Sequence, residues 1–288
     1  MTASSRASRW GLAGAVAGML AGLVAFAPAR WVGWAVSEAT QGRVILAQAQ
    51  GTAWSGQARV TLTGGPGSRD ALTLPGRLSW DLGLDLAGRS GWPWSAPAQG
   101  AAGGGWAGRL ILHHSECMPV PVALRFQPGI GRWTLSLPAR KPQEPASLMQ
   151  WPAAWLGALG TPWNTLQPSG QLRLSSPGGS LQWTQGRFQL DGSLVLEAEN
   201  MASRLSTLDR LGSYRAVVSG GGSGAEVATL QLSTVDGALL LSGTGQWTGA
   251  RFRLRGEARA APGQEAALQN LLNLIGTRDG ARSILSIG

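Results

Sequence analysis

The stretch RFRLR at residues 251–255 alternates charged and apolar side chains without interruption. In a β-strand, successive side chains point to opposite faces, so the three arginines lie on one side of the sheet and Phe252 and Leu254 on the other. Charges of one sign are tolerable together only on a face that meets water. The stretch therefore predicts a strand with one wet face and one buried face.

The same alternation recurs along most of the chain. It is clearest at residues 58–63 (ARVTLT), 171–175 (QLRLS) and 229–233 (TLQLS). Clusters of Gly, Ser and Pro separate such runs at intervals typical of hairpins, and 43 glycines among 288 residues fit many turns between short strands. The sequence predicts a mainly β fold of antiparallel, curved sheet.

Two stretches break this pattern and divide the chain. Residues 152–159 begin with a proline and end before Gly160, which predicts a short helix. Near the end, Leu268, Leu271, Leu272 and Ile275 have the i, i+3, i+4, i+7 spacing of a short amphipathic helix that packs on a sheet. We expect two β-rich halves, at 42–141 and at 170–288 with the C-terminal helix, joined by a Pro/Trp-rich helical connector at 142–169.

An uncharged run, Trp10–Ala29, lies between Arg9 and Arg30. As a helix it would extend about 30 Å, the thickness of the hydrocarbon core of a bilayer. We expect a transmembrane anchor over 10–34, a cytoplasmic tail over 1–9 and export of everything that follows. A cleaved signal peptide is the second interpretation, since residues 25–27 (AFA) fit a cleavage site that the following Pro28 would hinder, and a buried core helix is the third.

Three glycines share one face of the expected anchor. Gly14, Gly18 and Gly22 form two consecutive small-xxx-small steps, which allow close approach of a second helix. Such spacings also arise by chance in helices rich in alanine and glycine. The three positions are candidates for a transmembrane interface.

Composition limits the partners of the chain. The formal net charge is +9, but no helix-turn-helix, zinc or RNP-type pattern accompanies the dispersed arginines. We therefore expect no nucleic-acid binding and favour anionic lipid headgroups or an acidic protein as partners. Cys117 is the sole cysteine, so no intrachain disulfide can form, and we expect a buried thiol.

The residues that could carry chemistry are few. His113, His114 and Cys117 are close in sequence, but neighbours on a strand point to opposite faces and would not share a metal ion. Glu197 and Glu199 share a strand face, which would allow acid/base catalysis but is more typical of a solvated face. With no nucleophile elbow and no phosphate-binding loop in the sequence, we expect neither an enzyme nor a cofactor.

Nine short segments, taken in their order along the chain, resemble a known protein family. They are PARW (28–31), GRV (42–44), GTAWSG (51–56), PWNTL (162–166), SGQL (169–172), LGSYR (211–215), GAL with LSG (237–239 and 241–243), RGEA (255–258) and LLNLIG (271–276). In this order they resemble the type II secretion system protein N family. The region Ser90–Gly105 matches the family poorly. The positions that carry the resemblance are Gly51, Trp54, Gly56, Trp163, Asn164, Gly170, Gly212, Tyr214, Gly243, Gly256, Leu271, Leu272 and Gly276.

The resemblance implies an accessory subunit of the machine that moves folded proteins from the periplasm across the outer membrane of a Gram-negative bacterium. It also implies a single-pass inner-membrane protein with a cytoplasmic N-terminus and a periplasmic body. The implied partners are the inner-membrane platform subunits and the outer-membrane secretin. For Trp54 and Trp163 we favour a packing role over partner contact.

Two other functions fit the same residues. A periplasmic lipid-handling protein could present a groove in a curved β-sheet to acyl chains, with arginines at the headgroups. An open, continuous apolar trough would favour lipid, and a filled core would favour assembly. A soluble periplasmic binding module, released by signal cleavage, is the third candidate.

Overall fold

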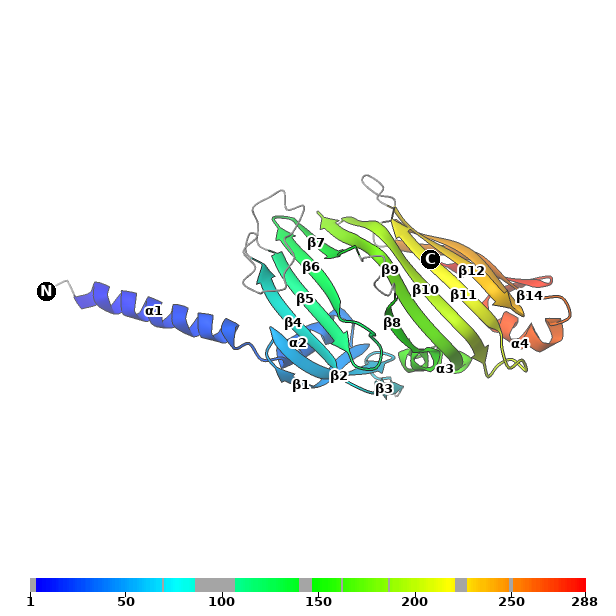
Figure 1. The fold of residues 1–288 in the computed structure, drawn as a ribbon, viewed down its shortest axis with the longest axis horizontal. Coiled ribbons are helices and arrows are strands. Elements are labelled where there is room, and N and C mark those ends of the chain that lie inside the picture. Colours follow the sequence, from blue (N-terminus) through cyan, green and yellow to red (C-terminus); the bar gives the residue numbers. More distant parts are fainter. Residues whose placement is uncertain are drawn as a thin grey trace.

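The computed structural model describes residues 4–68, 70–85, 107–139, 147–161, 163–185, 187–220, 227–248 and 251–288. The poorly matching region Ser90–Gly105 lies outside these residues, as do the first three residues of the expected tail. A long helix at the N-terminus leads into a body made of strands, with shorter helices at one end of the strands (Figure 1).

The helices are few and mostly short. They are α1 (Ser4–Ala25), α2 (Arg30–Ala39), the 3₁₀ helix η1 (Ala153–Leu159), α3 (Trp163–Leu166) and α4 (Glu265–Ile275).

The described strands form one antiparallel sheet. They are β1 (Val44–Gly51), β2 (Ser55–Thr63), β3 (Ala71–Thr73), β4 (Leu78–Asp85), β5 (Ala107–His114), β6 (Val122–Gly129), β7 (Arg132–Leu137), β8 (Ser147–Pro152), β9 (Pro168–Thr184), β10 (Arg187–Ser203), β11 (Gly212–Gly220), β12 (Val227–Gly237), β13 (Leu239–Thr248), β14 (Arg251–Ala260), β15 (Thr277–Asp279) and β16 (Arg282–Ile287). Their order is β1-β2-β4-β5-β6-β7-β9-β10-β11-β12-β13-β14-β16-β15, with β3 on β2 and β8 on β9. The predicted mainly β, antiparallel fold is confirmed.

Strand β9 carries the sheet across the expected connector. Its residues 171–175 pair with β8 and its residues 179–184 with β7, while β10 pairs along its other edge. Where β9 changes its partner from β8 to β7, Gly178 has a φ of +125°, and a Cβ there would lie 2.8 Å from the Cα of Ala139. The hydrogen-bonded sheet therefore continues through both expected halves, and the domain boundaries stay a prediction.

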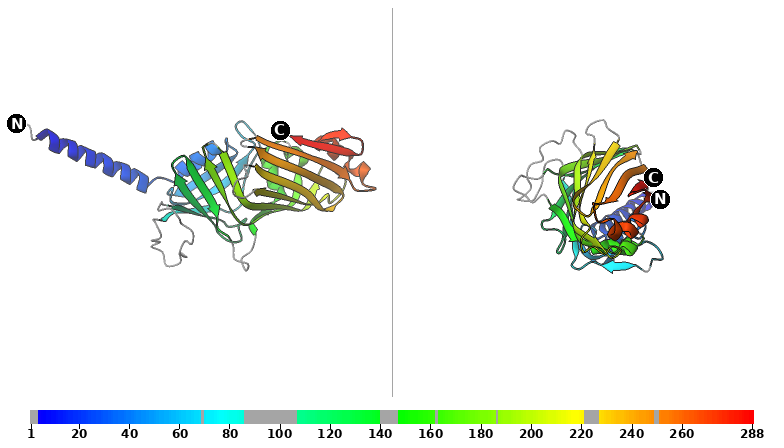
Figure 2. Two further views of the ribbon diagram at one scale, coloured as in Figure 1. Left: turned by 90° about the horizontal axis from the view of Figure 1, so that it is seen from above. Right: turned by 90° about the vertical axis from the view of Figure 1, so that its right-hand side faces the viewer.

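The sheet curls so that one face lines a trough. Figure 2 shows this curvature along the long axis, with α3 and α4 on the inner side. The register places Leu196 of β10 beside Leu174 of β9 and Ala216 of β11 on the inner face. Their chain neighbours Glu197 and Arg215 then point outward, because the side-chain period is two. The alternation read from the sequence separates an apolar concave face from a polar convex face.

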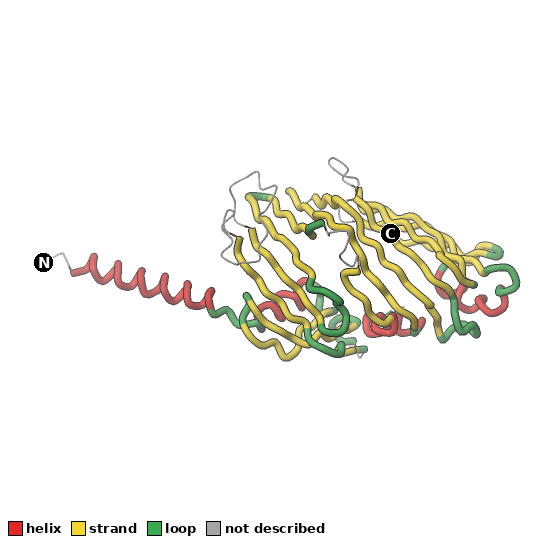
Figure 3. Tube along the Cα trace, in the orientation of Figure 1, coloured by secondary structure: helices red, strands yellow, loops and turns green. Residues whose placement is uncertain are grey.

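The helices of the body cover one end of the trough, as the red segments at the bottom of Figure 3 show. Helix α4 buries Leu268, Leu271 and Leu272 against a core cluster that includes Tyr214 and Ala258. The predicted amphipathic C-terminal helix is confirmed. The short helix predicted at 152–159 is present as η1, which packs against β9.

The N-terminal helix ends earlier than expected. Helix α1 stops at Ala25, because Pro28 cannot donate the next helical hydrogen bond and disfavours a helical residue before it. Residues 27–29 instead join the sheet: the Ala29 N–H donates to the Gly51 carbonyl at 3.1 Å, and the Ala53 N–H donates to the Ala27 carbonyl at 2.7 Å. Residues 30–34, expected in the anchor, belong to α2 and pack on β1. Among the described residues, none of the helices has the length and apolarity needed to cross a membrane.

Candidate functional site

The part of the trough that the helices leave open is the candidate site. Its centre is a row of leucines from neighbouring strands, in which Leu181 of β9 stands between Leu135 of β7 and Leu190 of β10. All three side chains are only half-buried. A sheet face of this kind normally buries its apolar side against a second layer. Among the described residues, that layer is present at one end only.

A groove lies at this centre, between β6, β7, β9 and β10. Its volume is about 260 Å³, it is open on one side, and Leu124, Leu135, Leu181, Leu190 and Leu194 contribute to its lining. Strand β9 bulges beside it, where the Ser176 hydroxyl donates to the Ser193 carbonyl at 2.7 Å. The groove can hold an apolar group and offers almost no polar contact to it.

Aromatic rings stand between the groove and the ends of the strands. Two residues further along the strands, on the same face as the leucines, Trp183 of β9 pairs with Trp133 of β7 on one side and with Phe188 of β10 on the other. The ring of Trp133 stacks on Trp183 with centroids 6.5 Å apart and meets Phe188 edge-on at 6.0 Å. Phe126 lies 6.2 Å from Trp133. We call these four residues the aromatic cluster.

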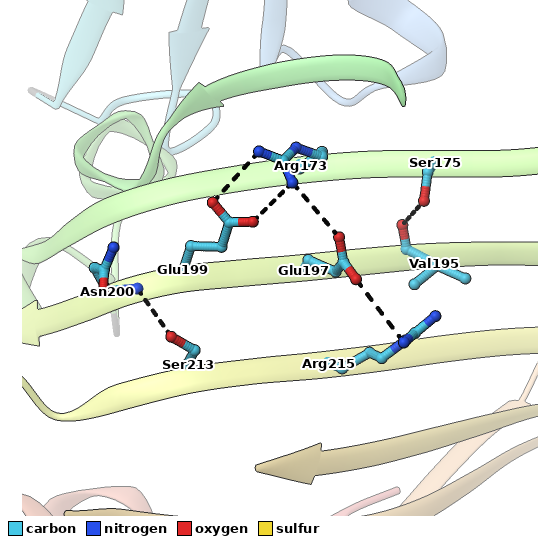
Figure 4. Close-up of polar contacts among 8 residues, drawn as sticks. All are labelled: Arg173, Ser175, Val195, Glu197, Glu199, Asn200, Ser213 and Arg215. Carbon is cyan, nitrogen blue, oxygen red and sulfur yellow. Dashed lines mark hydrogen bonds and ion pairs between the residues drawn. The ribbon is translucent and has the colours of Figure 1, made fainter. Parts of the chain in front are cut away.

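The convex face carries an ion-pair ladder. Arg173 binds Glu199 through both guanidinium nitrogens, at 2.8 and 3.4 Å, and lies 3.9 Å from Glu197 (Figure 4). Arg215 of β11 approaches Glu197 from the other side, also at 3.9 Å. Both carboxylates, considered above as acid/base candidates, are therefore paired with arginines on a solvated face.

The histidine and cysteine positions lie at the end of β5. His114 faces inward and is 2% exposed, and its Nδ1 accepts a hydrogen bond from the Glu116 N–H at 3.3 Å. Burial lowers the pKa of His114, with Glu116 opposing this shift and His113 adding to it. Burial likewise raises the pKa of the Cys117 thiol to about 11. In the part of the chain that is described, no cluster of three or more His, Cys, Asp or Glu residues could hold a metal ion.

The first family-like positions lie where α1 joins the sheet. The Trp54 indole N–H donates to the Val24 carbonyl in the last turn of α1, at 2.8 Å. Gly51, with a φ of +90°, forms the end of the β1–β2 hairpin opposite Gly56. A Cβ on Gly56 would lie 2.5 Å from the ring of Trp80, so glycine leaves room for this indole against the hairpin.

The connector positions fasten α3 to the sheet. Asn164 donates from Nδ2 to Asp70 at 3.0 Å, which ties α3 to the segment before β3. Trp163 is 39% exposed. Gly170 has a φ of +122°, and a Cβ there would lie 2.7 Å from the Glu199 carbonyl oxygen.

The remaining family-like positions surround the C-terminal core. The Tyr214 hydroxyl donates to the Leu239 carbonyl at 3.1 Å, and burial raises its pKa well above the ordinary value. Gly212 has a φ of +153° at the start of β11. Gly243 and Gly256 stand opposite each other, and a Cβ on Gly256 would lie 3.0 Å from the Cα of Gly243.

Helix α4 and the turn after it complete this core. Leu271 and Leu272 are 2% and 1% exposed, and the Leu272 carbonyl accepts a hydrogen bond from Ser283 at 2.6 Å. A Cβ on Gly276 would lie 2.5 Å from the Ile284 carbonyl oxygen. In the structure these positions serve turns and packing, and their part in partner contact stays a prediction.

Helix α1 presents its glycines to open space. It extends away from the sheet (Figure 1), and a Cβ on Gly14, Gly18 or Gly22 would meet no atom within 4 Å. The face is therefore free to receive another helix, and its use as a docking surface stays a prediction.

Comparison with known proteins decides the family. A family model described as "Type II secretion system (T2SS), protein N" matches residues 42–285, which is most of the chain. The chain belongs to the type II secretion system protein N family. The chain is thus a component of type II secretion and works with other components of that system. No curated protein and no solved structure gives a significant match to it.

The sequence did not predict the groove or the aromatic cluster. One feature of the sequence could have indicated the aromatic cluster: an arginine directly precedes an aromatic residue after two hairpin turns, in Arg132-Trp133 and in Arg187-Phe188. Each pair places a charge on one face and a ring on the other. That the two rings meet is visible only once β9 brings the two hairpins together.

Proposed function

We propose that this chain is an accessory, non-catalytic component of type II secretion that is anchored in the inner membrane and works by contact in the periplasm. The family match over the whole β body is the observation that carries this proposal. In it, the apolar part of α1 is the single-pass tether, with the N-terminus in the cytoplasm, and the glycine face of α1 meets an inner-membrane platform subunit.

The periplasmic body offers one strand edge for further contact. Strand β15 pairs with β16 along one side, and its three residues, Thr277–Asp279, are exposed. An unpaired strand edge can bind a strand of another protein through main-chain hydrogen bonds. We place the contact with the platform or the outer-membrane secretin at this edge.

Site-specific photocrosslinking in intact cells tests the proposal. A crosslinking amino acid at position 18 should give an adduct with a platform subunit, and one at position 278 an adduct with the secretin or the platform. Position 246, exposed on the convex face of β13, is the matched control and should give neither. Unchanged secretion after deletion of the gene, together with no platform or secretin adduct at 18 or 278, would refute the proposal.

A second candidate function, lipid handling in the periplasm, is supported by the open apolar trough. A protein that only assembles needs no unfilled apolar face, because exposed apolar surface of this kind normally marks a binding site. Mass spectrometry of organic extracts of the purified protein tests this candidate. A lipid present in stoichiometric amount supports it, and an extract free of lipid after purification without detergent counts against it.

A further inference from the structure

The groove at the centre of the trough has the shape and lining of a site for an alkyl chain. The leucines of β6, β7, β9 and β10 supply its wall, and nearly all of its exposed surface is apolar. Its volume of about 260 Å³ lies just below the ~300 Å³ at which small-molecule sites usually begin. It is therefore suited to part of a long apolar molecule whose remainder stays outside.

The aromatic cluster lies just beyond the leucines, at one end of this groove. Trp133 and Trp183 are half-buried, whereas Phe126 and Phe188 are 37% and 44% exposed. Tryptophan has an apolar ring system with one polar N–H, and for that reason it gathers at the boundary between hydrocarbon and headgroups. The order along the strands, leucine and then aromatic residue, follows the order within an amphiphile, alkyl chain and then polar junction.

Positive charge lies at the β6–β7 turn, next to the aromatic cluster. Arg132, the first residue of β7, is exposed and points to the convex face, because it directly precedes Trp133 of the inner face. The same turn bears Ile130, whose side chain is fully exposed. An apolar tip beside an arginine suits the surface of a membrane that contains anionic lipids.

We propose that the groove binds one acyl chain of an anionic phospholipid taken from the adjacent membrane, with the aromatic cluster at the ester region and the β6–β7 turn, through Ile130 and Arg132, on the anionic membrane surface. The inference rests on the lipid-handling candidate and is independent of the role in secretion. Ile130 enters the membrane surface first and brings the aromatic end of the groove to the headgroups.

The test uses the full chain with vesicles of phosphatidylcholine that contain phosphatidylglycerol carrying a diazirine on one acyl chain. After irradiation, peptide mapping should place adducts on β7, β9 and β10 within the groove. Leu181→Lys puts a charge among the leucines and should lower the adduct yield about tenfold or more, because a charge in apolar surroundings is costly. Gln182→Lys adds the same charge to the same strand on the convex face and should leave the yield unchanged.

Two further variants separate the parts of the proposal. Leu190→Phe fills the groove without adding charge, so it keeps the test valid if Leu181→Lys unfolds, and its adduct yield should fall as well. Arg132→Glu should weaken capture of phosphatidylglycerol, whereas Arg59→Glu on the distant strand β2 makes the same change of net charge and should not. Adducts outside the groove, or equal yields from Leu190→Phe and the wild type, would overturn the site. If lipid still co-purifies with the protein in that case, the lipid-handling candidate survives without this site.

Discussion

Replacement of Ser283 by alanine should loosen α4 from the sheet. The last four carbonyl groups of a helix have no partner within it, and the Leu272 carbonyl is the first of these four in α4. Ser283 of β16 supplies the missing donor with its hydroxyl, at 2.6 Å. Ser283 and Leu272 are 0% and 1% exposed, so water cannot take the place of the hydroxyl.

The structure sets the magnitude of this effect. Alanine removes the donor and leaves the Leu272 carbonyl buried without a partner, which costs about 1–3 kcal/mol. Only one oxygen atom is removed, so the cavity left behind is small. We expect the free energy of unfolding to fall by about 2 kcal/mol.

Equilibrium denaturation of the purified chain measures this difference. The midpoint should move to lower denaturant concentration with an unchanged slope, because the change affects the folded state. Ser286→Ala is the matched control, since Ser286 lies on the same strand with its side chain exposed, and a change of less than about 0.5 kcal/mol is expected there. If Ser283→Ala also stays within about 0.5 kcal/mol of the wild type, the proposed anchoring of α4 is incorrect.

Three further predictions concern other parts of the sheet. Gly56→Ala should cost about 1–3 kcal/mol in chemical denaturation, because the new Cβ would lie 2.5 Å from the Trp80 ring. Burial lowers the pKa of His114 in the folded chain, so on acidification the imidazole is protonated in the unfolded chain at a higher pH than in the folded chain. The free energy of unfolding should therefore be at its full value above about pH 6.5 and should fall below that pH. His114→Gln should flatten this part of the stability profile. Glu199→Gln should cost less than about 1 kcal/mol at low salt and less still at high salt, because its pair with Arg173 is more than one-third exposed.

Each of these predictions has a control or a contrary outcome. Gly83→Ala places a Cβ in open space on β4 and should change the stability far less than Gly56→Ala. A stability profile in which His114→Gln keeps the full acid dependence would assign that dependence to other groups. A loss of several kcal/mol in Glu199→Gln would mean that the convex ladder is not solvated as described.

Much of the fold follows from the chain alone. The period of two in segments such as 251–255 gives each strand an apolar and a polar face, and the leucine spacing of 268–275 gives a helix with one apolar side. These patterns are local, because neighbouring side chains alternate whatever the partner strand is. They were enough to predict antiparallel sheet, the C-terminal helix and the placement of charges on a solvated face.

The site depends on contacts between segments far apart in the chain. The local pattern indicates that an apolar face must be covered, but not how far the short helices reach along that face. The open groove exists because β9 changes its partner from β8 to β7 beyond the helices, and the aromatic cluster exists because the same strand joins two hairpins. In the same way, residues 27–29 join the sheet through backbone hydrogen bonds with residues 51–53, which a hydropathy pattern does not contain.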